Sequence, residues 1–163
     1  MDDVELPGGA RIEYGVLESG GFAAVVPVTG GGDVVLVRQW RQPLNAFTLE
    51  LPSGGVDANE KPEQAARREL FEETGYRAEG LEHLLSVHTG TGRSTEVCHL
   101  FGCRAVRDER GPQPEPTEFI RVVELPVAEA LRMVSGGRIT DAGTVLGLLL
   151  GVGGGAAISG GLH

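Results

Sequence analysis

The stretch GGVDANEKPEQAARRELFEETGY, residues 54–76, decides how the rest of the chain is interpreted. It predicts a helix over 62–74, because a proline suits a first helical turn and a glycine follows directly after the expected end. Three carboxylates lie within five residues of that helix, namely Glu69, Glu72 and Glu73. An α-helix advances about 100° per residue, so the three share one arc roughly 100° wide. A cation stabilises such an arc of like charges. Because carboxylate oxygens are hard ligands, the arc predicts magnesium, calcium or manganese.

The composition is that of one globular domain with a hydrophobic core. The chain has 163 residues, of which 40% are hydrophobic and 23% are charged. Its formal net charge of −9 argues against a nucleic-acid partner, because proteins of that class normally present a basic patch. A small phosphorylated substrate is compatible with that charge, since a metal and a few arginines can hold phosphates locally.

The end of the chain is apolar but does not predict a membrane span. Residues 142–163 contain no Asp, Glu, Lys or Arg. Their leucines give way to closely spaced glycines, which favours a buried helix ending near Val152 and a flexible glycine-rich tail over 153–163. The amino terminus is acidic and no apolar run follows it, so no secretion signal is indicated.

The two cysteines, Cys98 and Cys103, are expected on one strand. Their odd spacing puts the side chains on opposite faces, so they cannot form a disulfide within that strand. Two free thiols in a reducing compartment are the preferred interpretation, which predicts a cytoplasmic protein.

Short apolar runs bounded by turn residues predict strands before and after the helix. The expected strands are 22–28, 34–39, 49–52, 84–88, 96–107 and 119–125, and residues 4–17 are expected to form a hairpin or a pair of edge strands. A second helix is expected over 127–135, and Asp141 is expected to cap a last one. Residues 53–55 are expected to be a loop whose backbone approaches a ligand. This order of elements predicts a mixed α/β domain.

The fixed residues around the first helix follow a defined spacing. Gly54 is followed after five residues by Glu60, and seven more residues lead to Arg68-Glu69-Leu70, Glu72-Glu73 and Gly75. This pattern resembles the Nudix box, the signature of the Nudix hydrolases, and departs from it only at Tyr76, where an aliphatic residue is usual. The resemblance implies an α/β/α sandwich with a mixed sheet over residues 21–152. It also implies hydrolysis, with magnesium or manganese, of a nucleoside diphosphate linked to another moiety.

The resemblance implies which residues act in catalysis. The expected metal ligands are Glu69, Glu72, Glu73, Glu118 and the backbone carbonyl of Ser53, and the residues expected to take part in catalysis are Glu72, Glu115, Glu118, Arg68 and Glu60. Arg68 is expected to orient Glu60, with an ion pair to Glu72 as the alternative. Glu115 is the nearest candidate for the general base, off register by one, because Pro116 stands where the closest alignment puts the acid. The alternative for both loop glutamates is that they are solvated charges.

Segments outside the box resemble the ADP-ribose pyrophosphatase branch of the family. They include VRQWRQP at 37–43 and LELPSGG at 49–55. In that branch the equivalent of Arg41 contacts phosphate and that of Glu50 helps to form the substrate site, and an arginine fork suits a diphosphate. Gly54 and Trp40 complete the expected substrate site, with core packing as the alternative for Trp40. Thr91 stands where that branch usually has a proline sixteen residues after the box glycine, so other nucleotide sugars are also candidates.

We therefore expect a metal-dependent pyrophosphatase that cleaves ADP-ribose or another nucleoside diphosphate sugar to a nucleoside monophosphate and a sugar phosphate. One alternative is hydrolysis of nucleoside triphosphates or dinucleoside polyphosphates, and another is a non-catalytic sensor of nucleotide sugars. The branch is generally homodimeric, and its amino-terminal strands contribute to the partner's substrate site. Residues 1–20 are therefore the expected dimer interface.

Overall fold

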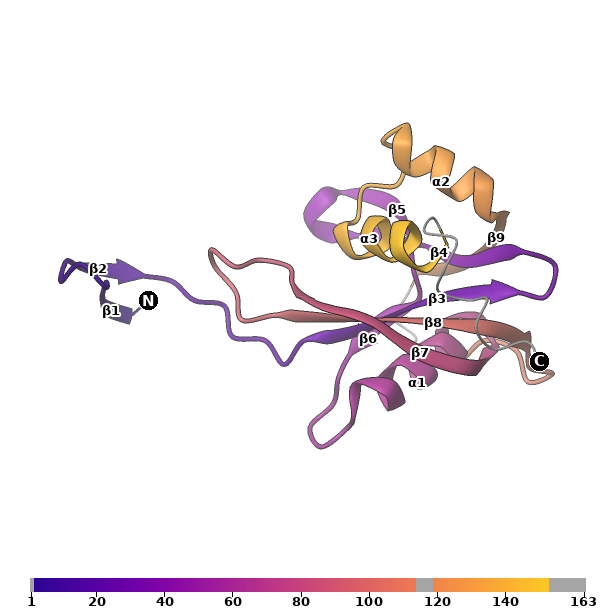
Figure 1. Cartoon of the computed structure of the whole chain (residues 1–163), viewed down its shortest axis with the longest axis horizontal. Coiled ribbons are helices and arrows are strands. Elements are labelled where there is room, and N and C mark those ends of the chain that lie inside the picture. Colours follow the sequence, from indigo (N-terminus) through magenta and orange to yellow (C-terminus); the bar gives the residue numbers. More distant parts are fainter. Residues whose placement is uncertain (1, 114–118, 153–163) are drawn as a thin grey trace.

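The computed structural model describes residues 2–113 and 119–152 (Figure 1). Its elements are β1 (Asp2–Glu5), β2 (Arg11–Tyr14), β3 (Phe22–Thr29), β4 (Asp33–Arg41), the short 3-10 helix η1 (Gln42–Leu44), β5 (Ala46–Glu50), β6 (Ser53–Gly55), α1 (Pro62–Thr74), β7 (Tyr76–His88), β8 (Val97–Arg107), β9 (Ile120–Pro126), α2 (Val127–Ser135) and α3 (Ala142–Gly151).

Seven of the strands form one mixed sheet, in the order β5-β4-β3-β8-β7, with β6 beside β3 and β9 beside β4. The pair β3–β8 is parallel and the other pairs of this sheet are antiparallel. Helix α1 covers one face of the sheet, and α2 and α3 cover the other (Figure 1). The predicted α/β/α sandwich with a mixed sheet is confirmed.

Strand β8 shows how the sheet divides the hydrophobic core. Phe101 and Cys103 are buried against α1, whereas Cys98 and Leu100 are buried on the side of α2 and α3. Both cysteines are free thiols on opposite faces, as their spacing predicted. Burial disfavours the charged thiolate, and it raises the pKa of each thiol to about 12.

Helix α1 has the predicted ends. At its carboxyl end Gly75 adopts a φ of 71°, and its N–H donates to the carbonyl of Phe71 at 2.8 Å. Lysine is a poor capping residue, and the Lys61 side chain makes no cap hydrogen bond. Instead the Gln64 side chain accepts a hydrogen bond from the backbone N–H of Lys61 at 2.9 Å, which closes the first turn.

Helix α3 is held to the strands that precede α1. Asp141 caps it, as predicted, by accepting a hydrogen bond from the N–H of Thr144 at 2.8 Å. The hydroxyl of Thr144 accepts one from the N–H of Leu51 at 3.0 Å. The start of α3 is thereby fixed next to the segment that joins β5 to β6. No helix in the described part of the chain is long and apolar enough to cross a membrane.

Two predictions about the strands were wrong, and the strand expected over 49–52 begins and ends earlier, as β5 at Ala46–Glu50. Residues 53–55 are not a loop but strand β6, in which Gly54 pairs with Ala23 of β3. Strand β7 begins at Tyr76 rather than near residue 84, and its first half pairs with the end of β8. Neither segment has the β-branched residues that indicate a strand, so pairing with a neighbouring strand outweighs local propensity in both.

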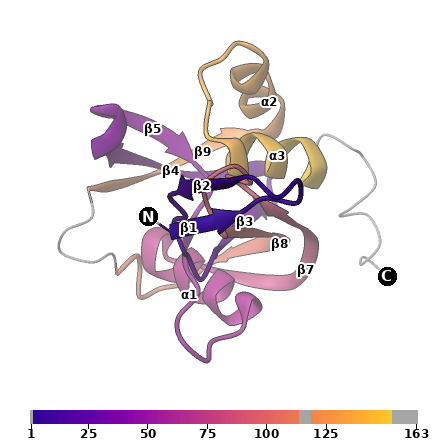
Figure 2. The same cartoon turned by 90° about the vertical axis from the view of Figure 1, so that its left-hand side faces the viewer.

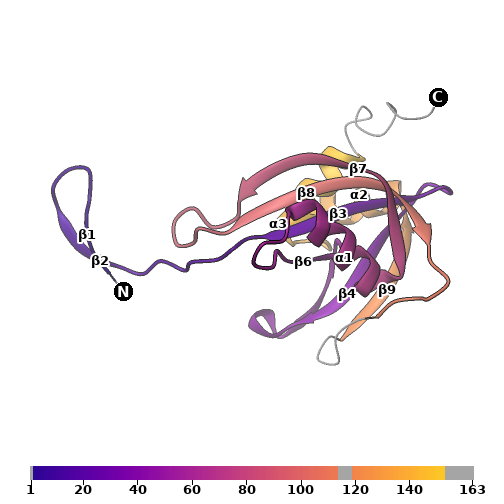
Figure 3. The same cartoon turned by 90° about the horizontal axis from the view of Figure 1, so that it is seen from below.

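The amino-terminal hairpin of β1 and β2 projects from the domain (Figures 1 and 3) and lies in front of it when the molecule is viewed from that end (Figure 2). Ile12 and Tyr14 lie on one face of it and remain 38% and 37% exposed. The chain that follows is tied to the loop between β7 and β8. There the N–H of Leu17 donates to the carbonyl of Arg93 at 2.7 Å, and its carbonyl accepts from the N–H of Thr95 at 3.1 Å.

Asp108 joins the end of β8 to the end of α1. Its N–H donates to the carbonyl of Gly75 at 2.9 Å, and its carboxylate receives Arg110 Nε at 3.0 Å and Arg77 Nε at 2.9 Å. The hydrogen bonds from Arg110, and then the charges of Arg110 and Arg77, lower the pKa of Asp108 to about 2.

We expect Asp108→Asn to lower the melting temperature at pH 7 but not at pH 2. An unfolded aspartate has a pKa of about 3.9, so the folded state with the lower pKa gains stability above about pH 4 and loses it as the pH falls toward 2. Thermal melts of both proteins across pH 7 to 2 measure this. A difference between them that is constant across the range would contradict the assignment.

Candidate active site

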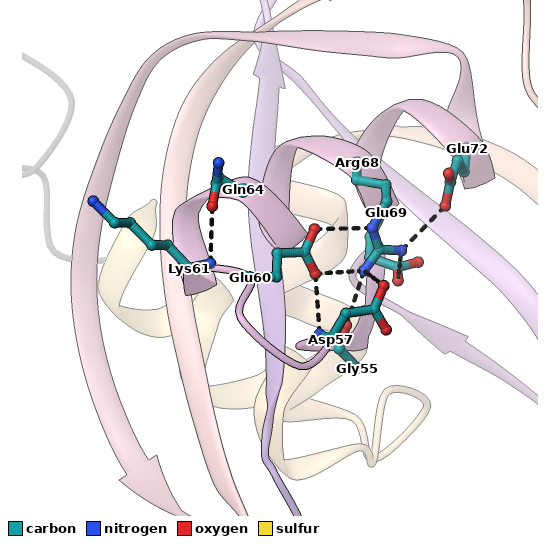
Figure 4. A network of polar contacts seen from close by, with 8 residues as sticks. All are labelled: Gly55, Asp57, Glu60, Lys61, Gln64, Arg68, Glu69 and Glu72. Carbon is teal, nitrogen blue, oxygen red and sulfur yellow. Dashed lines mark hydrogen bonds and ion pairs between the residues drawn. The ribbon is translucent and has the colours of Figure 1, made fainter.

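The guanidinium of Arg68 lies at the centre of a polar network that joins the segment before α1 to the second half of the helix (Figure 4). Its Nε and Nη2 donate to the two oxygens of Glu60 at 3.0 and 2.9 Å, and Nη2 also donates to the carbonyl of Gly55 at 2.9 Å. Its Nη1 donates to Glu69 at 2.5 Å and to Glu72 at 3.2 Å. Both contacts that the sequence predicted as alternatives for Arg68 are therefore present together. The bonds with Glu60 raise the pKa of Arg68 and lower that of Glu60.

Strand β6 passes directly against the carboxylates of α1. The N–H of Ser53 donates to Glu73 at 2.9 Å, and Glu73 is only 2% exposed. Next to it, a side chain on Gly54 would overlap the carboxylate of Glu69. Because β6 is paired with β3, its backbone cannot easily move away from the helix. A glycine is required here by close approach of the backbone to a carboxylate.

The oxygen atoms along this edge of α1 suit a hard divalent cation. Glu69, Glu72 and Glu73 supply carboxylates, and the backbone of β6 lies directly against them, with the Glu69 carboxylate in the space that a side chain at residue 54 would need. Among residues 2–113 and 119–152, no group of three or more His, Cys, Asp or Glu side chains is already gathered as a complete metal cluster. The carboxylates are instead drawn to Arg68 and to the backbone of Ser53.

The two glutamates predicted to act from a late loop, Glu115 and Glu118, lie outside the described residues. The chain enters that loop at the carboxyl-terminal turn of α1, where the N–H of Gln113 donates to the backbone carbonyl of Glu72 at 2.7 Å. The predicted roles of both glutamates stay predictions.

A cavity of about 350 Å³ opens at the end of β5. Its walls are formed by Arg41, Pro43, Leu44, Thr48, Glu50, Thr140, Asp141 and Ala142. Glu50 is 4% exposed and accepts hydrogen bonds from Arg41 Nε at 2.9 Å, Gln39 Nε2 at 3.1 Å and the hydroxyl of Thr48 at 2.5 Å. These bonds fix the plane of the Arg41 guanidinium at the cavity wall.

A carboxylate on α1 contributes to the electrostatic surroundings of Arg41 at this cavity. The pKa of Arg41 is raised, mainly by its hydrogen bond to Glu50 and further by the charges of Asp141 and Glu73. Burial acts to raise the pKa of Glu50, but the hydrogen bonds from Arg41, Thr48 and Gln39 outweigh it and the net shift is downward. Sequence reasoning predicted Asp141 only as a helix cap. Its place in the cavity comes from the hydrogen bond between α3 and the segment after β5.

The structure does not bring Trp40 to this cavity. Trp40 and Arg41 are adjacent on β4, so their side chains point to opposite faces of the sheet. The Trp40 ring packs edge-to-face on Phe47 at 5.2 Å between centroids, and its N–H donates to Gln42 at 3.0 Å. The predicted contact of Trp40 with substrate stays a prediction, and packing is the role that these contacts favour.

Thr91 lies in the loop between β7 and β8, where it is exposed. This loop contacts the hairpin itself, since the hydroxyl of Tyr14, the last residue of β2, donates to the carbonyl of Gly92. Thr91 is not among the residues that line the cavity at Arg41.

Comparison with known proteins agrees with this arrangement. Residues 21–142 match the family model of the NUDIX domain. The chain is 36% identical over 146 residues to an ADP-ribose pyrophosphatase of Bacillus subtilis, covering 88% of this chain and 78% of the relative. It is 36% identical over 147 residues to a methanol dehydrogenase activator of Bacillus methanolicus, covering 90% and 80%. It is 36% identical over 126 residues to a GDP-mannose pyrophosphatase of Yersinia enterocolitica, covering 71% and 64%.

The match includes the box that carries the carboxylates and the strands that form the cavity. Nudix hydrolases generally require a divalent metal, and the oxygen donors of α1 and β6 fit that requirement. The chain therefore belongs to the Nudix hydrolase family.

Proposed function

We propose that this Nudix hydrolase cleaves the diphosphate of a nucleoside diphosphate sugar and releases a nucleoside monophosphate and a sugar phosphate. The observation that carries the proposal is the cavity at Arg41 and Glu50, whose arginine lies within electrostatic reach of Glu73 on α1. A diphosphate between two sugars needs a phosphate-binding arginine beside the groups that hold a metal. Relatives named for ADP-ribose and for GDP-mannose support this substrate class.

Each side chain has a distinct part in the proposed reaction. Glu69, Glu72, Glu73 and the carbonyl of Ser53 would hold magnesium or manganese, and Glu118 would join them from the late loop. When bound, the metal activates water and neutralises charge that develops on the phosphates. Arg41 binds the diphosphate, and Glu50 holds one edge of its guanidinium so that the other edge faces the substrate.

Proton transfer is proposed for the late loop, with Glu115 as the general base. The hydrogen bond from the N–H of Gln113 to the backbone carbonyl of Glu72 supports this, because it holds the entry of the loop at the last turn of α1, which carries Glu72 and Glu73. Arg68 and Glu60 act indirectly, through the hydrogen bonds that Arg68 donates to Glu69 and Glu72.

A substrate panel tests the proposal. Purified protein is incubated with magnesium or manganese and with ADP-ribose, GDP-mannose, other nucleotide sugars, nucleoside triphosphates and dinucleoside polyphosphates, and the products are identified by chromatography. We expect a nucleoside monophosphate and a sugar phosphate from at least one nucleotide sugar. Faster turnover of a triphosphate or a dinucleoside polyphosphate would favour the other enzymatic alternative. Binding without turnover of any compound would favour a sensor.

We expect Arg41→Lys to raise the KM for the best substrate by on the order of tenfold, with a smaller effect on kcat. Lysine keeps the charge but loses the planar fork that both Glu50 and a diphosphate require. Arg38→Lys is the matched control, since Arg38 is on the same strand but its guanidinium stacks on the Phe47 ring at 4.0 Å. Equal KM values for the two variants would contradict the role of Arg41.

The proposal includes a homodimer in a reducing cytoplasm. An isolated two-stranded hairpin is at best marginally stable in water, so β1 and β2 need a partner for their exposed apolar side chains. The two buried free thiols are compatible with a reducing compartment. Light scattering of the full chain should give twice the monomer mass, and deletion of residues 1–13 should give a monomer. A monomeric full chain would rule out the dimer.

A further inference from the structure

The contacts of Arg68 divide its guanidinium into two halves (Figure 4). The Nε and Nη2 half is bound by Glu60, at 3.0 and 2.9 Å, and by the carbonyl of Gly55 at 2.9 Å. The Nη1 half is bound by Glu69 at 2.5 Å and Glu72 at 3.2 Å. Of these acids, Glu69 and Glu72 are proposed metal ligands, whereas Glu60 precedes the helix.

The same guanidinium also interacts with a fourth acid. Besides these three glutamates, Asp57 approaches Nη2 at 3.9 Å. The hydrogen bonds from Arg68 to the three glutamates are charge-assisted, and such bonds are about twice as strong as neutral ones. Nη1 therefore stabilises the like charges of Glu69 and Glu72, which is also what a bound metal would do.

We infer that Arg68 competes with the metal for Glu69 and Glu72, and that Glu60 sets metal affinity by limiting this competition. Glu60 is itself held in place, because it accepts a hydrogen bond from the N–H of Asp57 at 3.1 Å. It thus anchors two of the guanidinium's nitrogens at a fixed distance from the carboxylate arc. The inference rests on the metal site of the proposed function.

A purely supporting role for Arg68 leads to the opposite expectation. If the arginine only oriented the two glutamates, removing it would weaken metal binding. If it competes with the metal, removing its positive charge tightens binding, because a like charge next to the site is lost. The sign of the change in affinity therefore distinguishes the two roles.

Replacement of Glu60 leads to a second expectation. Glutamine at this position keeps the shape of the side chain but lacks the charge that holds Nε and Nη2. The guanidinium of Arg68 would then donate more of its hydrogen bonds to Glu69 and Glu72. Metal binding should weaken, although Glu60 is not itself a proposed ligand.

Manganese binding measured by electron paramagnetic resonance tests the inference without any substrate. The proteins are the wild type, Arg68→Met, Glu60→Gln and the double variant, each at the same pH and ionic strength. We expect Arg68→Met to lower the Kd for Mn²⁺ by on the order of tenfold and Glu60→Gln to raise it several-fold. In the double variant the effect of Glu60→Gln should disappear, because Arg68, through which Glu60 acts on the metal site, is no longer present.

Two outcomes overturn the inference while leaving the proposed reaction intact. One is weaker Mn²⁺ binding by Arg68→Met, and the other is an effect of Glu60→Gln that persists in the double variant. Wild-type protein that binds no Mn²⁺ overturns both the inference and the metal site. Thermal melts with and without Mg²⁺ accompany each titration, since Arg68→Met should lower the melting temperature of the metal-free protein and enlarge the gain from Mg²⁺. If Arg68→Met does not fold, Arg68→Gln, which also removes the positive charge, takes its place in the titration and in the double variant.

Discussion

Gly54→Ala is expected to lower kcat by on the order of 10³-fold while changing the melting temperature by only a few degrees. A methyl group at this position would overlap the carboxylate of Glu69, and the strand that carries it is paired with β3 and cannot retreat. The carboxylate is the end of a flexible side chain, so it can rotate away at little cost in stability. That movement takes a proposed metal ligand out of place.

The neighbouring glycine supplies the control for this experiment. A Cβ on Gly55 meets no atom within 4 Å, and Gly55 does not adopt a positive φ. Gly55→Ala should therefore keep its activity. Steady-state kinetics and thermal melts of both variants separate the effects. Equal activity of the two alanine variants would show that Glu69 is not needed in its observed position.

Glu73→Gln is expected to reduce turnover by on the order of 10³-fold or more, because it removes a negative charge from the proposed metal site. The fold should be kept. Glutamine has the same shape, and its amide oxygen can still accept the hydrogen bond that the N–H of Ser53 donates at 2.9 Å. Turnover with saturating Mg²⁺ and the Kd for Mn²⁺ are the two measurements.

Glu63→Gln is the matched control, since Glu63 is exposed on the first turn of the same helix. It removes one charge from α1 without touching the site. If both variants lose turnover equally, the effect comes from the overall charge of the helix. If Glu73→Gln keeps full turnover, the metal is held elsewhere.

Much of the fold follows from local signals that the structure confirms. Helix α1 has its predicted ends because proline and glycine act within one turn of their own position. The burial of Cys98 and Cys103 on opposite faces of the sheet follows from the two-residue period of a strand. Strands β6 and the first half of β7 were missed, because their pairing depends on strands far away in the sequence rather than on their own residues.

The candidate active site could likewise be predicted only in part. The contacts of Arg68 with Glu60 and Glu72 lie within one helix and the turn before it, so spacing was enough to predict them. The cavity was different. Asp141 reaches it only because α3 is hydrogen-bonded to the segment after β5, a contact between residues 93 positions apart. Nothing in the spacing of the motif indicates such a contact.

The two buried cysteines have a practical consequence for studying the protein in solution. Maleimides react with thiolates, and thiols with a pKa of about 12 that are screened from solvent form almost none near neutral pH. The chain contains no other cysteine. A single cysteine introduced into the exposed hairpin would therefore accept a fluorophore selectively, with no change elsewhere in the sequence. Energy transfer between labelled chains would then measure the exchange of subunits between the proposed dimers.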